Sequence, residues 1–88
     1  MQVEFLERFS KDLDKLKVRQ IKDSVLRIIE RVEAASTLSE ISGIKKLAGF
    51  RNAYRIRTGD YRIGFFVDGN VIQFARIAHR KDIYKIFP

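Results

Sequence analysis

The hydrophobic pattern of this chain changes its period once, and that change limits the fold more than any other feature. Between residues 18 and 32 the apolar residues recur at steps of three and four, which predicts an amphipathic helix. From Asn52 onward apolar and polar residues alternate, in three runs separated by Gly59 with Asp60 and by residues 68–70. Helices followed by tightly connected strands predict an α+β fold, in which helices cover one face of an antiparallel sheet.

The segment before the long helix predicts a strand and a first helix. Residues 1–9 alternate loosely, which indicates a short strand, and Ser10 is a candidate helix cap. A break near Lys17 makes the two helices a hairpin. The expected fold is a sheet of this N-terminal strand and a three-stranded C-terminal meander, with the helical hairpin packed on one face. Residues 1–88 are expected to form a single domain.

The composition excludes several kinds of site. There is no cysteine and only one histidine, His79, so disulfides, thiolate zinc sites and all-histidine metal sites are excluded. We therefore expect no metal and no small-molecule cofactor. No apolar run approaches the ~20 residues of a membrane span, and the first residues lack the apolar stretch of a signal peptide, so we expect none. The expected environment is the cytoplasm, without a membrane partner.

The positive charge is concentrated in one half of the chain. The net charge is +7, and after Ile44 there are ten basic residues against three acidic ones. Such a concentration indicates a polyanionic partner, which is RNA, DNA or an acidic protein segment. The alternative is a generic basic surface that keeps the protein soluble, and composition does not decide between them.

Side-chain alternation in the first two runs of the meander sorts the residues onto two faces. A two-residue loop at Gly59 and Asp60 pairs Arg57 with Arg62 and Tyr54 with Phe65. The expected core face carries Tyr54, Ile56, Tyr61, Ile63 and Phe65. The other face carries Arg55, Arg57 and Arg62, beside Gly64 and Phe66.

Three arginines on one small patch favour a phosphate site. Opposed like charges destabilise a hairpin, whereas guanidinium groups bind phosphate through two parallel hydrogen bonds. Gly64 is expected to leave a concavity among them, and Phe66 to offer a stacking surface for a base. The alternative is that the arginines pair with Asp60, Asp68, Asp82 or acidic residues of the helices.

The C-terminal run adds two candidates to this patch. Arg80 follows the last strand, and Tyr84 lies one helical turn later on the same side. Nearby positive charge favours the phenolate of Tyr84, which makes it a candidate for proton transfer. The alternatives are a packed aromatic ring for Tyr84 and a structural role for His79.

Four segments, residues 46–49, 54–57, 59–63 and 79–84, make the chain resemble the RelE/ParE family of small toxins from toxin–antitoxin pairs. The resemblance covers nearly the whole chain and implies an acidic antitoxin that wraps the toxin. RelE-like members enter the ribosomal A site and cut mRNA without a metal, because the RNA 2′-hydroxyl attacks the adjacent phosphate and leaves a 2′,3′-cyclic phosphate. ParE-like members poison DNA gyrase and are not nucleases.

The resemblance implies two groups of site residues. The catalytic group is Arg55, Arg57, Arg62, Arg80 and Tyr84. The RNA-binding group is Lys45, Lys46, Arg51, Phe66, His79 and Lys81. The best-known RelE-like enzymes have lysines at positions 55 and 57, and arginine does not readily release a proton, so Tyr84 or His79 must carry more of the proton transfer.

The first hypothesis is therefore a RelE-like toxin that cuts mRNA on the ribosome and inhibits translation. Its partners are a cognate acidic antitoxin, the ribosome and mRNA. The alternatives are a ParE-like toxin that poisons DNA gyrase and an inactive relative that still binds an antitoxin.

Overall fold

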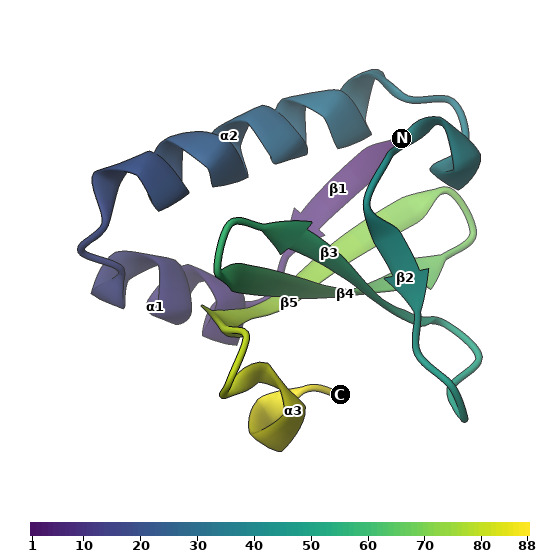
Figure 1. Cartoon of the computed structure of the whole chain (residues 1–88). Coiled ribbons are helices and arrows are strands. Elements are labelled where there is room, and N and C mark those ends of the chain that lie inside the picture. The colour runs from purple at the N-terminus through teal and green to yellow at the C-terminus, as the bar shows by residue number, and fades with distance from the viewer.

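A five-stranded sheet lies at the centre of the computed structural model, which describes residues 1–88 (Figure 1). The strands lie in the order β1-β5-β4-β3-β2. In chain order the elements are β1 (Gln2–Phe5), α1 (Glu7–Lys15), α2 (Arg19–Ala34), the 3-10 turn η1 (Leu38–Glu40), β2 (Ile44–Lys46), β3 (Ala53–Thr58), β4 (Tyr61–Asp68), β5 (Val71–His79) and α3 (Ile83–Ile86). No helix has both the length and the apolar character that a membrane crossing requires.

The predicted hairpin register between β3 and β4 is confirmed. Arg57 pairs with Arg62, and Tyr54 pairs with Phe65, around a two-residue turn in which Gly59 has a φ of +59°. Positive φ at the first turn position matches the twist of the flanking strands, and glycine adopts it without strain.

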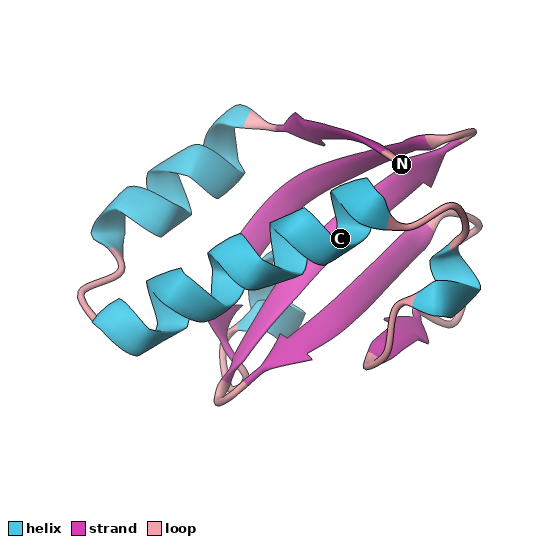
Figure 2. Cartoon of the chain, turned by 90° about the horizontal axis from the view of Figure 1, so that it is seen from above, coloured by secondary structure: helices cyan, strands magenta, loops and turns pink.

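Helices α1 and α2 form a layer over one face of the sheet (Figure 2). The predicted spacing of apolar residues is confirmed in α2, whose buried residues recur at steps of three, one and three: Val25, Ile28, Ile29 and Val32. The predicted core face of the hairpin lies beneath them, with Ile56, Ile63 and Phe65 buried in the same cluster and Tyr54 and Tyr61 packed against it. The predicted break between the helices is also confirmed, since α1 ends at Lys15 and α2 begins at Arg19.

The N-terminal boundary differs from the prediction. Strand β1 ends at Phe5 and α1 begins at Glu7, so Ser10 lies inside the helix and caps nothing. The reason is aromatic packing: the rings of Phe5 and Phe9 both lie against Phe74, with centroids 5.7 and 5.5 Å away. Phe9 reaches Phe74 from the first turn of a helix that has already begun.

Two strand features add to the prediction of an antiparallel sheet. Strand β1 pairs with β5 in parallel, so the sheet is mixed. Strand β2 extends the sheet beyond β3 and was not among the strands that the sequence predicted. The short helix α3 lies on the opposite face of the sheet from α1 and α2 (Figure 1). We call this opposite face, which carries Arg55, Arg57 and Arg62, the outer face.

Asp12 of α1 closes the edge of β5 that β1 leaves free. Strand β1 pairs only with residues 71–74 of β5. Further along, Asp12 Oδ2 accepts a hydrogen bond from the Ile77 amide (3.1 Å). The same carboxylate forms a two-bond ion pair with Arg76, in which Nε donates to Oδ2 (2.7 Å) and Nη2 donates to Oδ1 (3.1 Å). Hydrogen bonding to Asp12 raises the pKa of Arg76. One carboxylate thus satisfies the strand edge and neutralises an arginine.

Replacing Asp12 by alanine should lower the free energy of unfolding by about 3 kcal/mol, because it leaves a largely buried guanidinium and a strand amide unpaired. The side chains of Asp12 and Arg76 are 16% and 18% exposed. Urea denaturation measures the loss. The control is Glu7→Ala on the same helix, whose pair with Lys11 is exposed; this change should cost less than about 1 kcal/mol. Equal losses in the two variants would contradict a structural role for Asp12.

Candidate functional site

A cavity of about 300 Å³ opens on the outer face of strands β2, β3 and β4. Its lining residues are Gly43, Lys45, Arg55, Arg57, Arg62 and Tyr84. Four of these six residues are cations and one is a phenol. The cavity therefore concentrates positive charge beside one ionisable hydroxyl group.

Strand β2, which the sequence did not predict, supplies one wall of the cavity. Lys45 pairs with Arg55 across the β2–β3 ladder, so both side chains lie on the same face. Gly43, just before β2, has a φ of +80° and lines the cavity with its backbone. The isolated glycine is the only sequence signal for this wall, since three residues are too few to show alternation.

The cavity arginines are not paired with carboxylates. The structure contains two ion pairs, Glu7–Lys11 and Asp12–Arg76, and neither involves a cavity residue. Arg57 and Arg62 instead lie directly opposite each other in the β3–β4 register. Opposed like charges destabilise a sheet, so this arrangement does not serve stability.

Arg62 and Arg55 are held in different ways. Arg62 Nη1 donates to the carbonyl oxygens of Gly59 (3.1 Å) and Tyr61 (2.9 Å), which fixes its guanidinium at the hairpin turn. The Arg55 guanidinium carbon lies 4.5 Å from the centroid of the Tyr84 ring, within cation–π range. The Arg55 Nε is buried without a hydrogen-bond partner, which is a further cost to stability.

Tyr84 is a 73% exposed side chain with perturbed acidity. Arg55, through hydrogen bonding and charge, lowers the pKa of the Tyr84 phenol, and Lys45 and Arg62 add to this effect. The direction of this shift agrees with the effect expected from nearby positive charge. At neutral pH the deprotonated fraction of Tyr84 is therefore larger than that of an ordinary tyrosine.

Gly64 has a different role from the one expected. Instead of leaving a concavity among the arginines, it makes room for the ring of Phe87, with which a Cβ at position 64 would collide. The ring of Phe66 also packs against Phe87, with centroids 5.1 Å apart, so Phe66 belongs to the small core beneath α3. A four-residue helix is not stable alone, so Phe87 and the buried Ile83 hold α3, and with it Tyr84, on the sheet.

Replacing Gly64 by alanine should displace the Phe87 ring and loosen α3. We expect the free energy of unfolding to fall by about 2 kcal/mol from overpacking, and the pKa of Tyr84 to rise towards its ordinary value as the phenol leaves Arg55. The tyrosinate absorbance, titrated with and without Tyr84→Phe in the same background, measures the second effect. An unchanged Tyr84 titration would show that Phe87 does not position this residue.

The other predicted site residues lie outside the cavity. Lys46 pairs with Tyr54 and His79 pairs with Tyr61, so alternation places both on the face of the helical layer. His79 Nδ1 accepts a hydrogen bond from the Lys81 amide, and its ring lies edge-on to Tyr61. Arg51, Arg80 and Lys81 are exposed in loops. The structure therefore brings together Lys45, Arg55, Arg57, Arg62 and Tyr84 from the predicted set.

The donor groups of the chain do not gather as metal ligands do. No cluster of three or more His, Cys, Asp or Glu side chains is arranged to hold a metal ion.

Comparison with known proteins gives the class of this fold and cavity. The family model described as "ParE toxin of type II toxin-antitoxin system, parDE" matches residues 3–84. The chain belongs to the RelE/ParE family of type II toxins.

Among individual relatives, Toxin RelE3 of Methanocaldococcus jannaschii is 43% identical over 89 residues, covering 100% of both chains. A chain in the crystal structure of a RelB-RelE antitoxin-toxin complex from Methanococcus jannaschii is 42% identical, with a TM-score of 0.80 over 96% of this chain and 98% of that one. The archaeal RelE-RelB complex from Pyrococcus horikoshii OT3 is similar at 25% identity and a TM-score of 0.71, over 90% and 93% of the two chains.

Proposed function

We propose that this chain, acting in the cytoplasm as one domain of residues 1–88, is a ribosome-dependent mRNA endoribonuclease. The observation that carries the proposal is the cavity itself, where four unpaired cations surround a phenol of lowered pKa. The similarity of the whole chain to Toxin RelE3 favours a RelE-like function over a ParE-like one. Cleavage of translated mRNA inhibits protein synthesis.

The cavity cations suit the phosphate chemistry of this reaction. The RNA 2′-oxygen attacks the adjacent phosphorus, the bond to the 5′-oxygen breaks, and the products carry a 2′,3′-cyclic phosphate and a 5′-hydroxyl. Negative charge grows on the non-bridging oxygens in the transition state. Charged hydrogen bonds to those oxygens come from the cavity cations Lys45, Arg55, Arg57 and Arg62.

Tyr84 is the proposed general base. The 2′-hydroxyl must lose a proton, and the arginines of the cavity do not accept or release one near neutral pH. The Tyr84 phenolate, favoured by Arg55, takes that proton, and the departing 5′-oxygen takes a proton from water. His79, the other candidate, lies on the opposite face of the sheet.

The proposal includes a cognate antitoxin of acidic character. The Methanococcus jannaschii and Pyrococcus horikoshii relatives each form a complex with a RelB antitoxin. An acidic antitoxin segment over the cavity would neutralise the cations. Binding of this segment should weaken with salt, because salt screens exposed charges that are more than about 8 Å apart. Lys46, Arg51 and Lys81 stay proposed RNA contacts outside the cavity. Arg80, expected in the catalytic group, is absent from the cavity lining and is proposed as a further RNA contact.

The second candidate function is ParE-like poisoning of DNA gyrase. The description of the matching family model names the ParE toxin. The chain also has arginine at positions 55 and 57, where the best-known RelE-like enzymes have lysine. In this case induction causes loss of supercoiling and trapped gyrase–DNA breaks, while mRNA stays intact. An inactive relative would produce neither effect and would still bind its antitoxin.

Mapping of mRNA 5′ ends by primer extension after induction tests the first function. Wild-type protein should produce codon-phased cuts in translated mRNA, and Arg62→Ala should reduce them at least about 100-fold because it removes transition-state charge stabilisation. The matched control is Arg19→Ala, which removes an exposed cation from the first turn of α2, outside every proposed site, and should leave most cleavage intact. Growth arrest without phased cuts would contradict the endoribonuclease.

The pH dependence of cleavage tests the role of Tyr84. Because the phenolate is the active form and its pKa is lowered, the rate on programmed ribosomes should rise with pH and level off below the ordinary tyrosine value of about 10. Arg55→Gln should move this transition to higher pH. Tyr84→Phe keeps the ring beside Arg55 but should remove the transition, and a profile unchanged in this variant would exclude Tyr84 as the base.

A further inference from the structure

A second hollow adjoins the cationic cavity and has mostly apolar walls. Its volume is about 390 Å³. The walls come from the β2–β3 loop and the end of the chain: Leu47, Ala48, Phe50, Phe87 and Pro88. Arg55 and Tyr84 line both spaces, so the hollow, which we call the loop groove, lies directly beside the cationic cavity.

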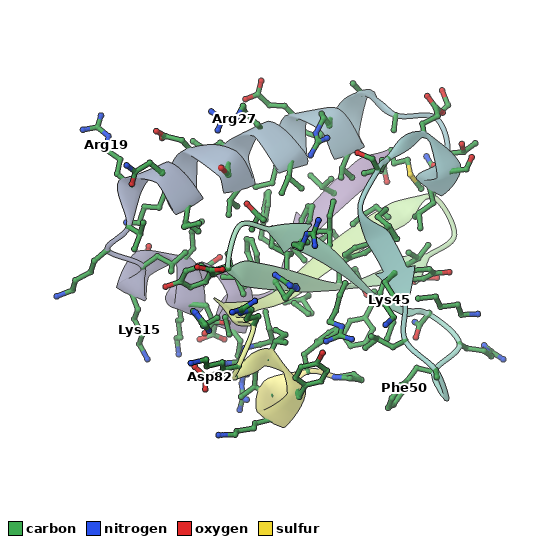
Figure 3. All side chains as sticks on the ribbon, viewed as in Figure 1. Lys15, Arg19, Arg27, Lys45, Phe50 and Asp82 are labelled. Atoms are coloured by element: carbon green, nitrogen blue, oxygen red, sulfur yellow. The ribbon has the colours of Figure 1, made fainter.

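Phe50 is the unusual residue of this groove. It is 49% exposed although it is a large aromatic side chain. Its loop is ordered by backbone hydrogen bonds from Leu47 to Ala53 (2.9 Å) and from Phe50 to Leu47 (3.4 Å). Figure 3 shows Phe50 extending from this loop on the side of the sheet where α3 lies. The turn therefore holds an apolar ring in solvent at the edge of the candidate site.

We propose that the loop groove binds a nucleobase of single-stranded RNA next to the phosphate held in the cavity. This inference rests on the proposed function, because it takes the cavity as the seat of the scissile phosphate. Each RNA phosphate is joined to nucleosides on both sides, so a strand that fills the cavity must send a neighbouring base out of it. The loop groove is the apolar space that adjoins the cavity through Arg55 and Tyr84.

The groups that line the groove recognise the flat face of a base rather than its edge. Phe50 and Tyr84 are aromatic, and the guanidinium of Arg55 is planar, so a base can stack on them. Most of the remaining wall is aliphatic and has no side-chain donor or acceptor to read the Watson–Crick edge. The groove should therefore accept any base and favour purines, which stack over a larger area.

Equilibrium binding of short RNAs tests this directly. The probes are six-nucleotide RNAs with a 2′-deoxy sugar at the cut position, which prevents cleavage, and with an abasic sugar placed in turn on either side of that phosphate. By fluorescence anisotropy, the wild-type protein should bind the complete RNA about tenfold more tightly than one of the two abasic probes, as expected for one stacked base. Phe50→Ala should bring that ratio close to one, and Phe50→Trp should keep it.

Leu26→Ala is the matched control, because Leu26 is 55% exposed and lies on α2, on the other side of the sheet from α3. It should leave the ratio unchanged. A ratio that survives in Phe50→Ala, or the absence of any base dependence in the wild-type protein, would overturn the loop groove as a base site. If Phe50→Ala instead weakens binding of the purified antitoxin and leaves the ratio intact, the groove is a peptide site and the proposal is also overturned.

These outcomes are separate from the test of the proposed function. Codon-phased mRNA cleavage without base-dependent binding would keep the endoribonuclease and reject the groove. Base-dependent binding that Phe50→Ala removes, together with intact mRNA after induction, would keep the groove and reject the endoribonuclease.

Discussion

The two-residue turn between β3 and β4 determines which side of the sheet carries the charge. With Gly59 at positive φ, Arg57 lies opposite Arg62, and alternation then sends Arg55 to the same face. One more residue in the turn would change the pairing and place part of the cluster against α2. The helical layer, the core and the cavity therefore all depend on the geometry of this single turn.

The outer face has unfavourable features that the core face lacks. The opposed pair of arginines and the buried Arg55 Nε without a partner lower the stability of the fold. The exposed phenol of Tyr84 adds nothing to it. The core beneath α1 and α2 supplies the stability that tolerates them, since its side chains pack without charged groups. Such a division between a stable layer and an unfavourable face is typical of functional sites.

The sequence predicted the parts of the fold that repeat and missed the parts that depend on single contacts. Alternation in β3 and β4 extends over enough residues to define the register and the arginine face. Strand β2 has three residues, too few for a pattern, so the placement of Lys45 beside Arg55 could not be predicted. The packing of Phe87 against Gly64 joins residues far apart in the chain, and neither has a periodic signal. The early start of α1 likewise follows from the contact of Phe9 with Phe74.

The pair formed by Asp12 and Arg76 also shapes the electric field around the molecule. Arg76 lies opposite Gly64 in the β4–β5 register, on the same face as the cavity, but its charge is neutralised. The unpaired cations that the strands place on that face are therefore those of β2, β3 and β4, where a recessed surface focuses the potential. A polyanion diffusing towards the sheet is steered to one half of it, so the orientation of first encounter is already close to the one in which a phosphate can enter.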